Sequence, residues 1–479
     1  MARFCRAAYT SKTLRTLQRR LLLTQTQPTK LFDEQSKEPK PGQNLLTARL
    51  EKLIDMGFFA DAFRFFDALP KSKITPSLAR LGLSALLLDG KFSTACLEEK
   101  ALRQVINFKD RFWEDLKATC SIVIGDGQEA SSLDKNSTLY KIVHNEGYKR
   151  LLSNTKGFSD LNNLEIASLF EFKKINLSSK ANIKEFSGKT LALLTQHHAL
   201  PDKTKNDVHQ LAFRKGLISE KKLKEAYLSI KIPESVPEWS LHALAYQRLQ
   251  DNLTQKEEWN IAADILKKPI SIELIAPFIS ILARSNPDNS QSPLTSQQIL
   301  TAIAAFLHEN IDIPRDWTAQ LSKLSATEDD ALAIMHLLET TGYIRKKNNS
   351  SVDNLRKSTE SLAINETEQV LLIKRFLDKK KEISNNPLNV YEKHFYLTSD
   401  GSYVMPSFIL LDRLRIAEKN RQTGLAVLIG LNILTASPER YHPAALMSIA
   451  QSLANVGLEK EVRELMKEIM TNFIKIKGE

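Results

Sequence analysis

Helical periodicity is the feature of this sequence that most constrains its fold. From Leu45 onwards apolar residues recur at three- and four-residue intervals, as in Leu50, Leu53 and Ile54, which is the spacing of one face of an α-helix. Clean alternation with period two, typical of a half-buried strand, is nearly absent. With only 16 Gly and 17 Pro among 479 residues, the chain lacks the turns that sandwiches, barrels and propellers need. The sequence therefore predicts an all-α protein.

A regular spacing of glycines adds detail to this prediction. A G-x-F-x-x-A pattern occurs twice, 33 residues apart, and its Gly and Ala recur after a further 35 residues: Gly57, Phe59 and Ala62, then Gly90, Phe92 and Ala95, then Gly125 and Ala130. Periods of this length in helical sequence are typical of helix-pair repeats. Gly permits the tight reversal between two helices, the aromatic residue fills the wedge between them, and Ala lets them pack closely.

This core resembles the tetratricopeptide repeat over about residues 45–150. The resemblance implies a degenerate α-solenoid of antiparallel helix pairs, whose concave surface binds other proteins. At the C-terminus Gly424 and Gly457 are again 33 residues apart, with Val462 in the Ala position. Residues 150–400 are helical without a detectable period. The segment around Trp113 and Gly125 also resembles uncharacterised helical-repeat proteins of alphaproteobacteria, which implies no activity.

The positive charge is concentrated at the N-terminus. Of the formal net charge of +11, residues 1–30 carry seven, and no acid precedes Asp33, which leaves +4 on the rest. A basic, hydroxyl-rich, acid-free start is typical of a mitochondrial transit peptide; the alternative is a basic disordered tail on a bacterial cytosolic protein. We therefore expect residues 1–40 to be a disordered tail, and the protein to reside in the mitochondrial matrix in a eukaryote or otherwise in the bacterial cytoplasm.

The rest of the chain is expected to form two helical parts. A polar, turn-forming segment at 285–295 predicts a linker or loop between an N-terminal helical-repeat region, 41–284, and a C-terminal helical region, 296–479. No apolar run reaches the roughly 18 residues of a membrane-spanning helix, so no integral membrane segment is expected.

The cysteines and histidines indicate no metal site. Cys5, Cys96 and Cys120 show no C-x-x-C spacing, so the sequence predicts neither a disulfide framework nor a zinc site and fits a reducing compartment. Cys96 and Cys120 fall on apolar helix faces and are expected to be buried as small hydrophobes.

One local cluster combines metal-ligand residue types, namely His197, His198, Asp202 and His209. Pro201 interrupts any helix that would align His198 with Asp202, so we expect a surface or loop cluster. The sequence contains no G-x-G-x-x-G, G-x-x-x-x-G-K-[ST], G-x-S-x-G or H-E-x-x-H motif. We expect no catalytic, metal or cofactor-binding residue, and a protein that is not an enzyme.

Two functions are compatible with this pattern. The first is a protein-interaction scaffold with an unknown protein partner, supported by the helix-pair period and the lack of a catalytic motif. The second is an RNA-binding helical-repeat protein in organellar gene expression, supported by the basic start and a period near 35 residues. Basic runs such as 345–347 and 379–381 are typical of solvated helix ends, and a recurring polar set that would read one base per repeat is not detected.

Overall fold

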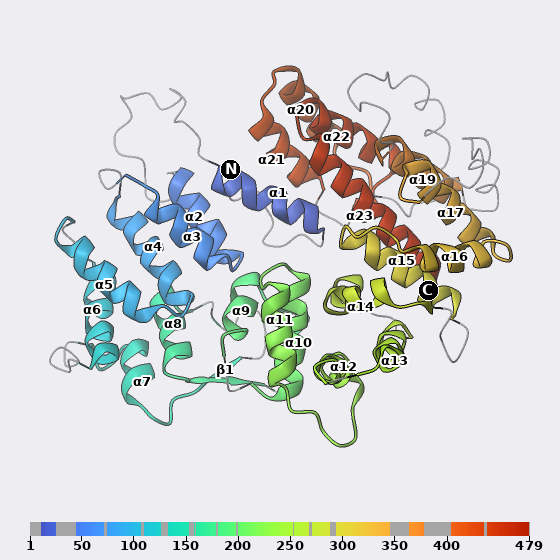
Figure 1. The fold of residues 1–479 in the computed structure, drawn as a ribbon. Coiled ribbons are helices and arrows are strands. Elements are labelled where there is room, and N and C mark those ends of the chain that lie inside the picture. Colours follow the sequence, from blue (N-terminus) through green and yellow to red (C-terminus); the bar gives the residue numbers. More distant parts are fainter. Residues whose placement is uncertain are drawn as a thin grey trace. The chain divides into compact units, whose positions relative to one another are not determined.

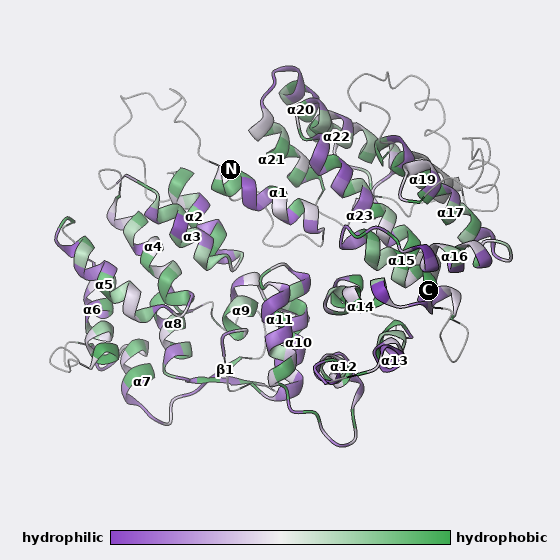
Figure 2. Ribbon diagram, viewed as in Figure 1, coloured by the Kyte–Doolittle hydropathy of each residue, from purple (hydrophilic) through white to green (hydrophobic). Residues whose placement is uncertain are grey.

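The architecture is described from a computed structural model of the chain. It covers residues 11–24, 45–70, 74–106, 110–125, 133–152, 158, 160–178, 181–197, 200–251, 253–267, 271–287, 294–344, 364–377, 404–434 and 438–478. Nearly all regular structure in these ranges is helical (Figure 1), which confirms the all-α prediction. Most helices carry both hydrophobic and hydrophilic residues along their length (Figure 2), as amphipathic helices do.

The chain divides into two compact units. Unit 1 comprises residues 1–8 and 22–219, and unit 2 comprises residues 9–21 and 220–479. The division therefore lies between Ser219 and Glu220, and not at the polar segment 285–295. The helices on either side of that segment pack against each other within unit 2, so the segment joins two neighbouring helices of one unit.

Unit 1 is built from short helices and one pair of strands. Its elements are α2 (Leu45–Asp55), α3 (Phe59–Asp67), α4 (Pro76–Leu88), α5 (Phe92–Arg103), α6 (Arg111–Ile124), α7 (Thr138–His144), β1 (Arg150–Leu152), α8 (Asn163–Glu171), β2 (Ile175–Leu177), the 3₁₀ helix η5 (Ile183–Glu185), α9 (Gly188–Leu194) and α10 (Asp202–Arg214). Strands β1 and β2 pair in parallel, with Arg150 opposite Ile175, and α8 forms the connection between them.

Local sequence explains where several of these helices begin. Thr75 accepts a hydrogen bond from the Leu78 N–H at 3.3 Å, and Pro76 occupies the first helical position of α4, where its missing N–H costs nothing. Asn162 and Glu165 form a capping box at the start of α8, which satisfies two otherwise unpaired backbone donors.

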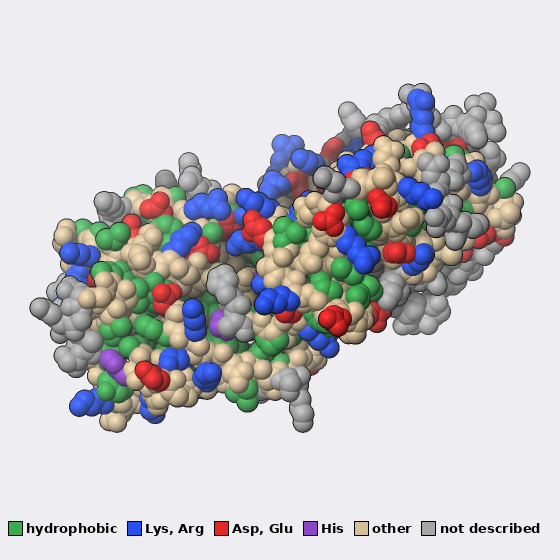
Figure 3. Space-filling model, turned by 60° about the horizontal axis from the view of Figure 1, so that its bottom comes forward, with side chains coloured by type: hydrophobic (Ala, Val, Ile, Leu, Met, Phe, Trp, Pro, Cys, Tyr) green, Lys and Arg blue, Asp and Glu red, His purple; other side chains and the backbone are tan. Residues whose placement is uncertain are grey.

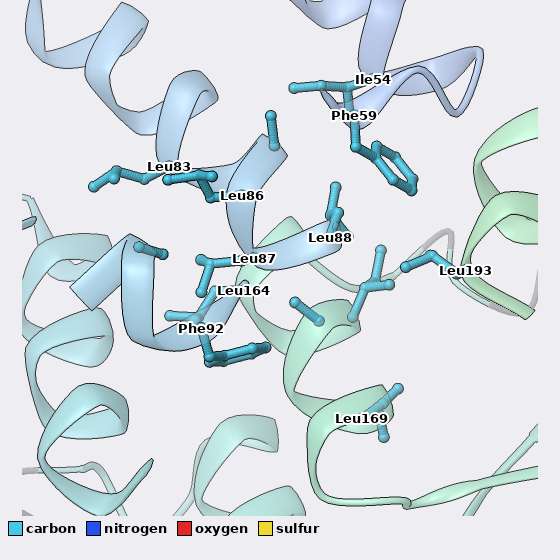
Figure 4. Close-up of a cluster of buried hydrophobic side chains, with 14 of the residues drawn as sticks. Ile54, Phe59, Leu83, Leu86, Leu87, Leu88, Phe92, Leu164, Leu169 and Leu193 are labelled. Carbon is cyan, nitrogen blue, oxygen red and sulfur yellow. The ribbon is translucent and has the colours of Figure 1, made fainter. Parts of the chain in front are cut away.

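The core of unit 1 lies where α2–α5, α8 and α9 meet. Figure 4 shows side chains from these helices converging, among them Phe59 of α3, Leu88 of α4, Leu164 of α8 and Leu193 of α9. Gly82 allows α4 to approach α3 closely, because a Cβ at that position would lie 2.4 Å from the Phe66 ring. A glycine in a helix interior otherwise only weakens the helix, so this glycine is retained for packing.

Unit 2 contains the remaining elements. They are α11 (Glu220–Ser229), η6 (Glu238–Ser240), α12 (Leu241–Arg248), α13 (Gln255–Leu266), η7 (Ile272–Phe278), α14 (Ile279–Arg284), α15 (Ser296–His308), α16 (Arg315–Leu324), α17 (Asp329–Thr341), α19 (Ile364–Leu377), α20 (Phe408–Lys419), α21 (Thr423–Ile433), η11 (Pro438–Arg440), α22 (Pro443–Asn455) and α23 (Glu459–Gly478). The long helix α23 packs against α15, α19 and α22.

Two tryptophans anchor one part of the unit 2 core. The rings of Trp259 and Trp317 lie 5.8 Å apart and close to edge-on, a favourable arrangement for aromatic pairs. The indole N–H of Trp317 donates to the Leu282 carbonyl at 2.9 Å, so this fully buried side chain has a partner for its one donor.

The N-terminal segment differs from the expected disordered tail. Residues 12–23 form helix α1 (Lys12–Leu23), in which Leu14 and Leu17 are buried. Residues up to Leu21 belong to unit 2, and Leu22 belongs to unit 1. The apolar residues between the basic ones therefore form a packed helix face. Residues 1–10 and 25–44 lie outside the described ranges.

Candidate functional site

The predicted repeat residues occupy equivalent positions in two helix–turn–helix pairs of unit 1. Gly57 follows α2 with φ +83°, and Gly90 follows α4 with φ +74°. Each glycine N–H donates to the carbonyl three residues earlier, at 2.9 and 3.1 Å. The N–H of the next residue donates to the carbonyl five residues earlier, at 2.9 and 3.0 Å. These bonds satisfy carbonyls that the helix end leaves free, and the left-handed backbone favours glycine.

The aromatic and alanine positions of the pattern also match. Phe59 begins α3 and Phe92 begins α5, with exposed fractions of 2% and 4%. Ala62 and Ala95 are fully buried. In both helix–turn–helix pairs, the aromatic ring and the small side chain thus enter the core of unit 1 from the first turn of the second helix.

The remaining repeat positions are placed only in part. Gly125 ends α6 with φ +85°, while Ala130 lies outside the described residues. Gly457 separates α22 from α23 with φ +89°, and Val462 is buried. Gly424 lies inside α21, and the turn before that helix is at Arg421.

Other helix ends adopt the same turn without the sequence pattern. Lys173, Asn310 and Arg421 have φ between +52° and +59°, and Gly216 and Gly342 have positive φ as well. At each of these five turns, the N–H of the positive-φ residue donates to the carbonyl three residues before it. The N–H of the next residue donates to the carbonyl five residues before itself. A search for glycine misses the three turns made by other residue types.

The cysteine prediction is wrong in one respect. Cys96 of α5 and Cys120 of α6 are buried, as expected, but they are joined by a disulfide. Their 24-residue separation carries no motif, and only the packing of α5 against α6 brings them together. Because disulfides persist mainly in oxidising compartments, the bond disagrees with the reducing compartment expected from the sequence.

The histidine cluster is not a metal site within the described residues. His197 is buried with its ring edge-on to Phe170, 5.8 Å between centroids. The Nδ1 of His209 lies 2.7 Å from the Lys205 carbonyl, Asp202 begins α10, and His198 lies outside the described ranges. Across the part of the chain that the structure covers, no group of His, Cys, Asp and Glu is arranged to hold a metal ion.

One cavity of unit 2 has a lining rich in charged side chains. It measures about 520 Å³ and is bounded by α1, the C-terminal end of α15 and α23. Its charged lining consists of Lys12, Arg20, Lys460, Lys467, Glu461, Glu464 and Glu468. Arg20 forms an ion pair with Glu461, so part of the positive charge of the N-terminal segment is neutralised within the fold.

Glu468 of α23 holds the N-terminus of α1. Its carboxylate accepts hydrogen bonds from the Ser11 hydroxyl at 2.9 Å, the Lys12 N–H at 2.9 Å and the Thr13 N–H at 3.2 Å. Burial raises the pKa of this carboxyl, and the three hydrogen bonds oppose that effect. The carboxylate serves as a helix cap supplied from the opposite end of the chain, at the positive end of the α1 dipole.

His308 also lines this cavity. Burial, followed by the nearby cations of which Lys12 is the largest contributor, lowers the pKa of His308 to about 4. The imidazole Nε2 lies 3.6 Å from the Glu309 carboxylate, but at this pKa the ring is neutral near pH 7 and the contact is not an ion pair there. The ammonium group of Lys467, another lining residue, donates a hydrogen bond to Asn310 and lies 5.6 Å from the centroid of the Tyr343 ring.

A second cavity in unit 2 has both apolar and charged residues in its lining. It measures about 390 Å³ and is lined by residues of η6, α12 and α13 and by Lys267. His242 lies in its wall with its Nε2 atom buried and, within the described part of the chain, without a hydrogen-bond partner. Burial lowers the pKa of His242 to about 4. Because that nitrogen is shielded from solvent, the ring acts here as a neutral packing group.

The surface charge and the lengths of the helices bear on whether the partner is a protein, an RNA or a membrane. On the face that Figure 3 draws, described Lys and Arg side chains are interspersed with Asp and Glu. Among the described helices, none combines the length and the apolar character needed to cross a bilayer.

The chain matches no protein-family model, no curated protein and no solved structure. Function is therefore inferred from the chain's own residues.

Proposed function

We propose that this chain is a non-enzymatic protein-interaction scaffold whose helices pair in antiparallel fashion, as in tetratricopeptide arrays. The observation that carries the proposal is the equivalence of the turns at Gly57 and Gly90. Both have the same backbone hydrogen bonds, the same buried Phe and the same buried Ala. Two consecutive helix pairs with one turn geometry are what a repeat array requires.

Further turns support the extension of the array beyond residue 150. Asn310 and Gly342 are 32 residues apart, and Arg421 and Gly457 are 36 residues apart, close to the period of helix-pair repeats. In each pair, the two turns follow α-helices of 12 or 13 residues. We infer that the array is degenerate because the turn residue varies while the turn geometry is kept.

The RNA-binding alternative has less support. It was motivated by the basic N-terminal segment, but Arg15 of that segment is buried and Arg20 pairs with Glu461. A cation that is buried or already ion-paired contributes less to counterion release on binding RNA than a free surface cation. The disulfide, in turn, favours a compartment in which disulfides persist over the matrix or the bacterial cytoplasm.

Quantitative affinity purification of the full chain from its native source, with and without ribonuclease, tests the proposal. We expect at least one protein enriched over a tag-only control and insensitive to ribonuclease. The test variant is Leu97→Ser with Val105→Ser, since these exposed apolar residues of unit 1 (67% and 71% exposed) are suited to an interface. Its matched control is Leu151→Ser with Leu228→Ser, at exposed apolar residues away from Leu97 and from α20.

Two results would oppose the scaffold. Enrichment of no protein by the wild-type chain would remove its basis. RNA crosslinked to the chain in cells above background, together with loss of all protein partners after ribonuclease, would favour the RNA-binding alternative.

A further inference from the structure

One helix of unit 2 presents an apolar surface to solvent. On its inner side α20 buries Leu414 and Ala417 and packs against α21 and α22. Glu418 accepts a hydrogen bond from the Ser452 hydroxyl of α22 at 2.6 Å. The helix is therefore fixed in its orientation, and its outer side is preformed.

The outer side carries four exposed apolar residues, from just before the helix to its last turn. Met405, just before α20, is 64% exposed, Phe408 is 78% exposed, Ile409 is 65% exposed and Ile416 is 49% exposed. Ile409 and Ile416 are seven residues apart and so lie on one face of the helix. An isolated exposed apolar residue needs no explanation, but a group on one rigid face marks an interaction surface.

Cations flank this apolar surface. Arg413 lies four residues beyond Ile409, Arg415 lies seven residues beyond Phe408, and Lys419 and Arg421 follow at the C-terminal end. All four are exposed, and none has an ion-pair partner within the described part of the chain. Against them stands one exposed acid, Asp412, since Glu418 is turned inward. The outer side of α20 thus has a local excess of positive charge.

The mixture of apolar and charged groups decides which occupant fits. A second copy of the chain would bring a second excess of positive charge to the interface, because a two-fold interface uses the same surface patch of both copies. A protein interface would bury Asp412 among the apolar residues, at the cost of its hydration. At a bilayer surface the apolar side chains enter the acyl boundary, while the long side chains of the four cations reach the anionic headgroups and outnumber the single Asp412.

We propose that the outer side of α20 docks on an anionic membrane surface, with Phe408 and Ile409 inserted and Arg413 and Arg415 facing the headgroups. This inference is independent of the scaffold function proposed above. The helix lies on the bilayer and does not cross it. Because it is already folded, binding has no helix-ordering cost to overcome, unlike that of peptides that fold on the membrane.

Co-sedimentation of the purified full chain with lipid vesicles tests this proposal. The probes are phosphatidylcholine vesicles with and without phosphatidylglycerol. We expect sedimentation with the anionic vesicles only, weakened by added salt. Phe408→Ser with Ile409→Ser should weaken binding about tenfold or more, from the loss of inserted apolar area. Arg413→Glu with Arg415→Glu should do the same, since each cation near an anionic surface contributes on the order of fivefold.

Matched controls separate docking from general effects. Leu97→Ser with Val105→Ser removes comparable exposed apolar surface from unit 1, and Lys221→Glu with Lys222→Glu makes the same charge change on α11. Both should bind as the wild type does, and circular dichroism should show all four variants folded. A wild-type chain that stays in the supernatant overturns the proposal and leaves a protein as the occupant. Equal loss of binding in the α11 charge variant overturns it as well.

Discussion

At the scale of single residues, the glycines of this chain differ in what they contribute. Gly57 and Gly125 have almost the same backbone angle, φ +83° and +85°. A Cβ on Gly57 would lie 2.6 Å from the Gly188 carbonyl oxygen, whereas a Cβ on Gly125 would meet nothing within 4 Å. The first glycine is required for backbone conformation and for space, and the second for conformation alone.

This difference gives a matched pair of substitutions. We expect Gly125→Ala to lower the free energy of unfolding by about 1–2 kcal/mol, from the left-handed backbone alone. Gly57→Ala should cost about 3 kcal/mol or more, because backbone atoms of α9 must also move. Urea unfolding monitored by circular dichroism measures both values. Equal losses for the two variants would contradict the close approach of the α2–α3 turn to α9.

At the scale of elements, α1 is the part that sequence patterning placed outside the fold. Its burial in unit 2 predicts that Leu17→Ala costs about 2–5 kcal/mol, as for other large-to-small core substitutions. Thr16→Ala, on the exposed side of the same helix, should change stability by no more than about 0.5 kcal/mol. Thermal and urea unfolding of the full chain provide the measurement. An unaffected Leu17→Ala variant would restore the disordered-tail interpretation.

The link between α5 and α6 is a second test at this scale. Closing a loop between residues 24 apart is expected to stabilise the folded chain by about 3 kcal/mol. Cys96→Ser with Cys120→Ser should lose that amount, and the wild type treated with a reductant should lose the same. Mass spectrometry after alkylation checks the bond directly, since Cys96 and Cys120 should react only after reduction. Their alkylation in the untreated, unfolded chain would show that no disulfide had formed.

At the scale of the whole molecule, stability is coupled to pH through two buried histidines. The pKa values of His308 and His242 are lowered to about 4 in the folded chain, against an ordinary value of about 6.5 in the unfolded chain. Between these values the unfolded chain binds more protons than the folded one. The stabilisation is therefore complete above about pH 6.5 and is lost as the pH falls towards 4.

We expect the free energy of unfolding to fall on acidification, by on the order of 3 kcal/mol for each histidine. Urea unfolding at a series of pH values between about 7 and about 4 measures the slope. His242→Leu should flatten it, because the apolar side chain needs no proton and leaves no buried nitrogen unpaired. His144→Leu is the control, since that histidine is exposed. If His242→Leu left the pH dependence of the free energy of unfolding unchanged, His242 would not be a source of that dependence.

Within the described ranges, the sequence by itself determined the helical class and the conformation of two turns. Apolar periodicity and scarce Gly and Pro suffice for helices, because both are local properties of the chain. The Gly–Phe–Ala pattern identified the turns at Gly57 and Gly90, where the residue type and the backbone conformation coincide. At Lys173, Asn310 and Arg421 the same conformation occurs at residues other than glycine, of which only Asn often adopts it, so a search for glycine does not find these turns.

Only the tertiary structure decided the features that join distant residues. Ser11 meets Glu468 across 457 positions, Cys96 meets Cys120, and the cations of α1 line a cavity with α15 and α23. None of these contacts has a local spacing, because each depends on how helix faces pack after the helices form. The basic N-terminal segment shows the consequence most clearly. Its composition is that of a targeting tail, but the burial of Leu14 and Leu17 and the cap from Glu468 make residues 12–21 part of unit 2.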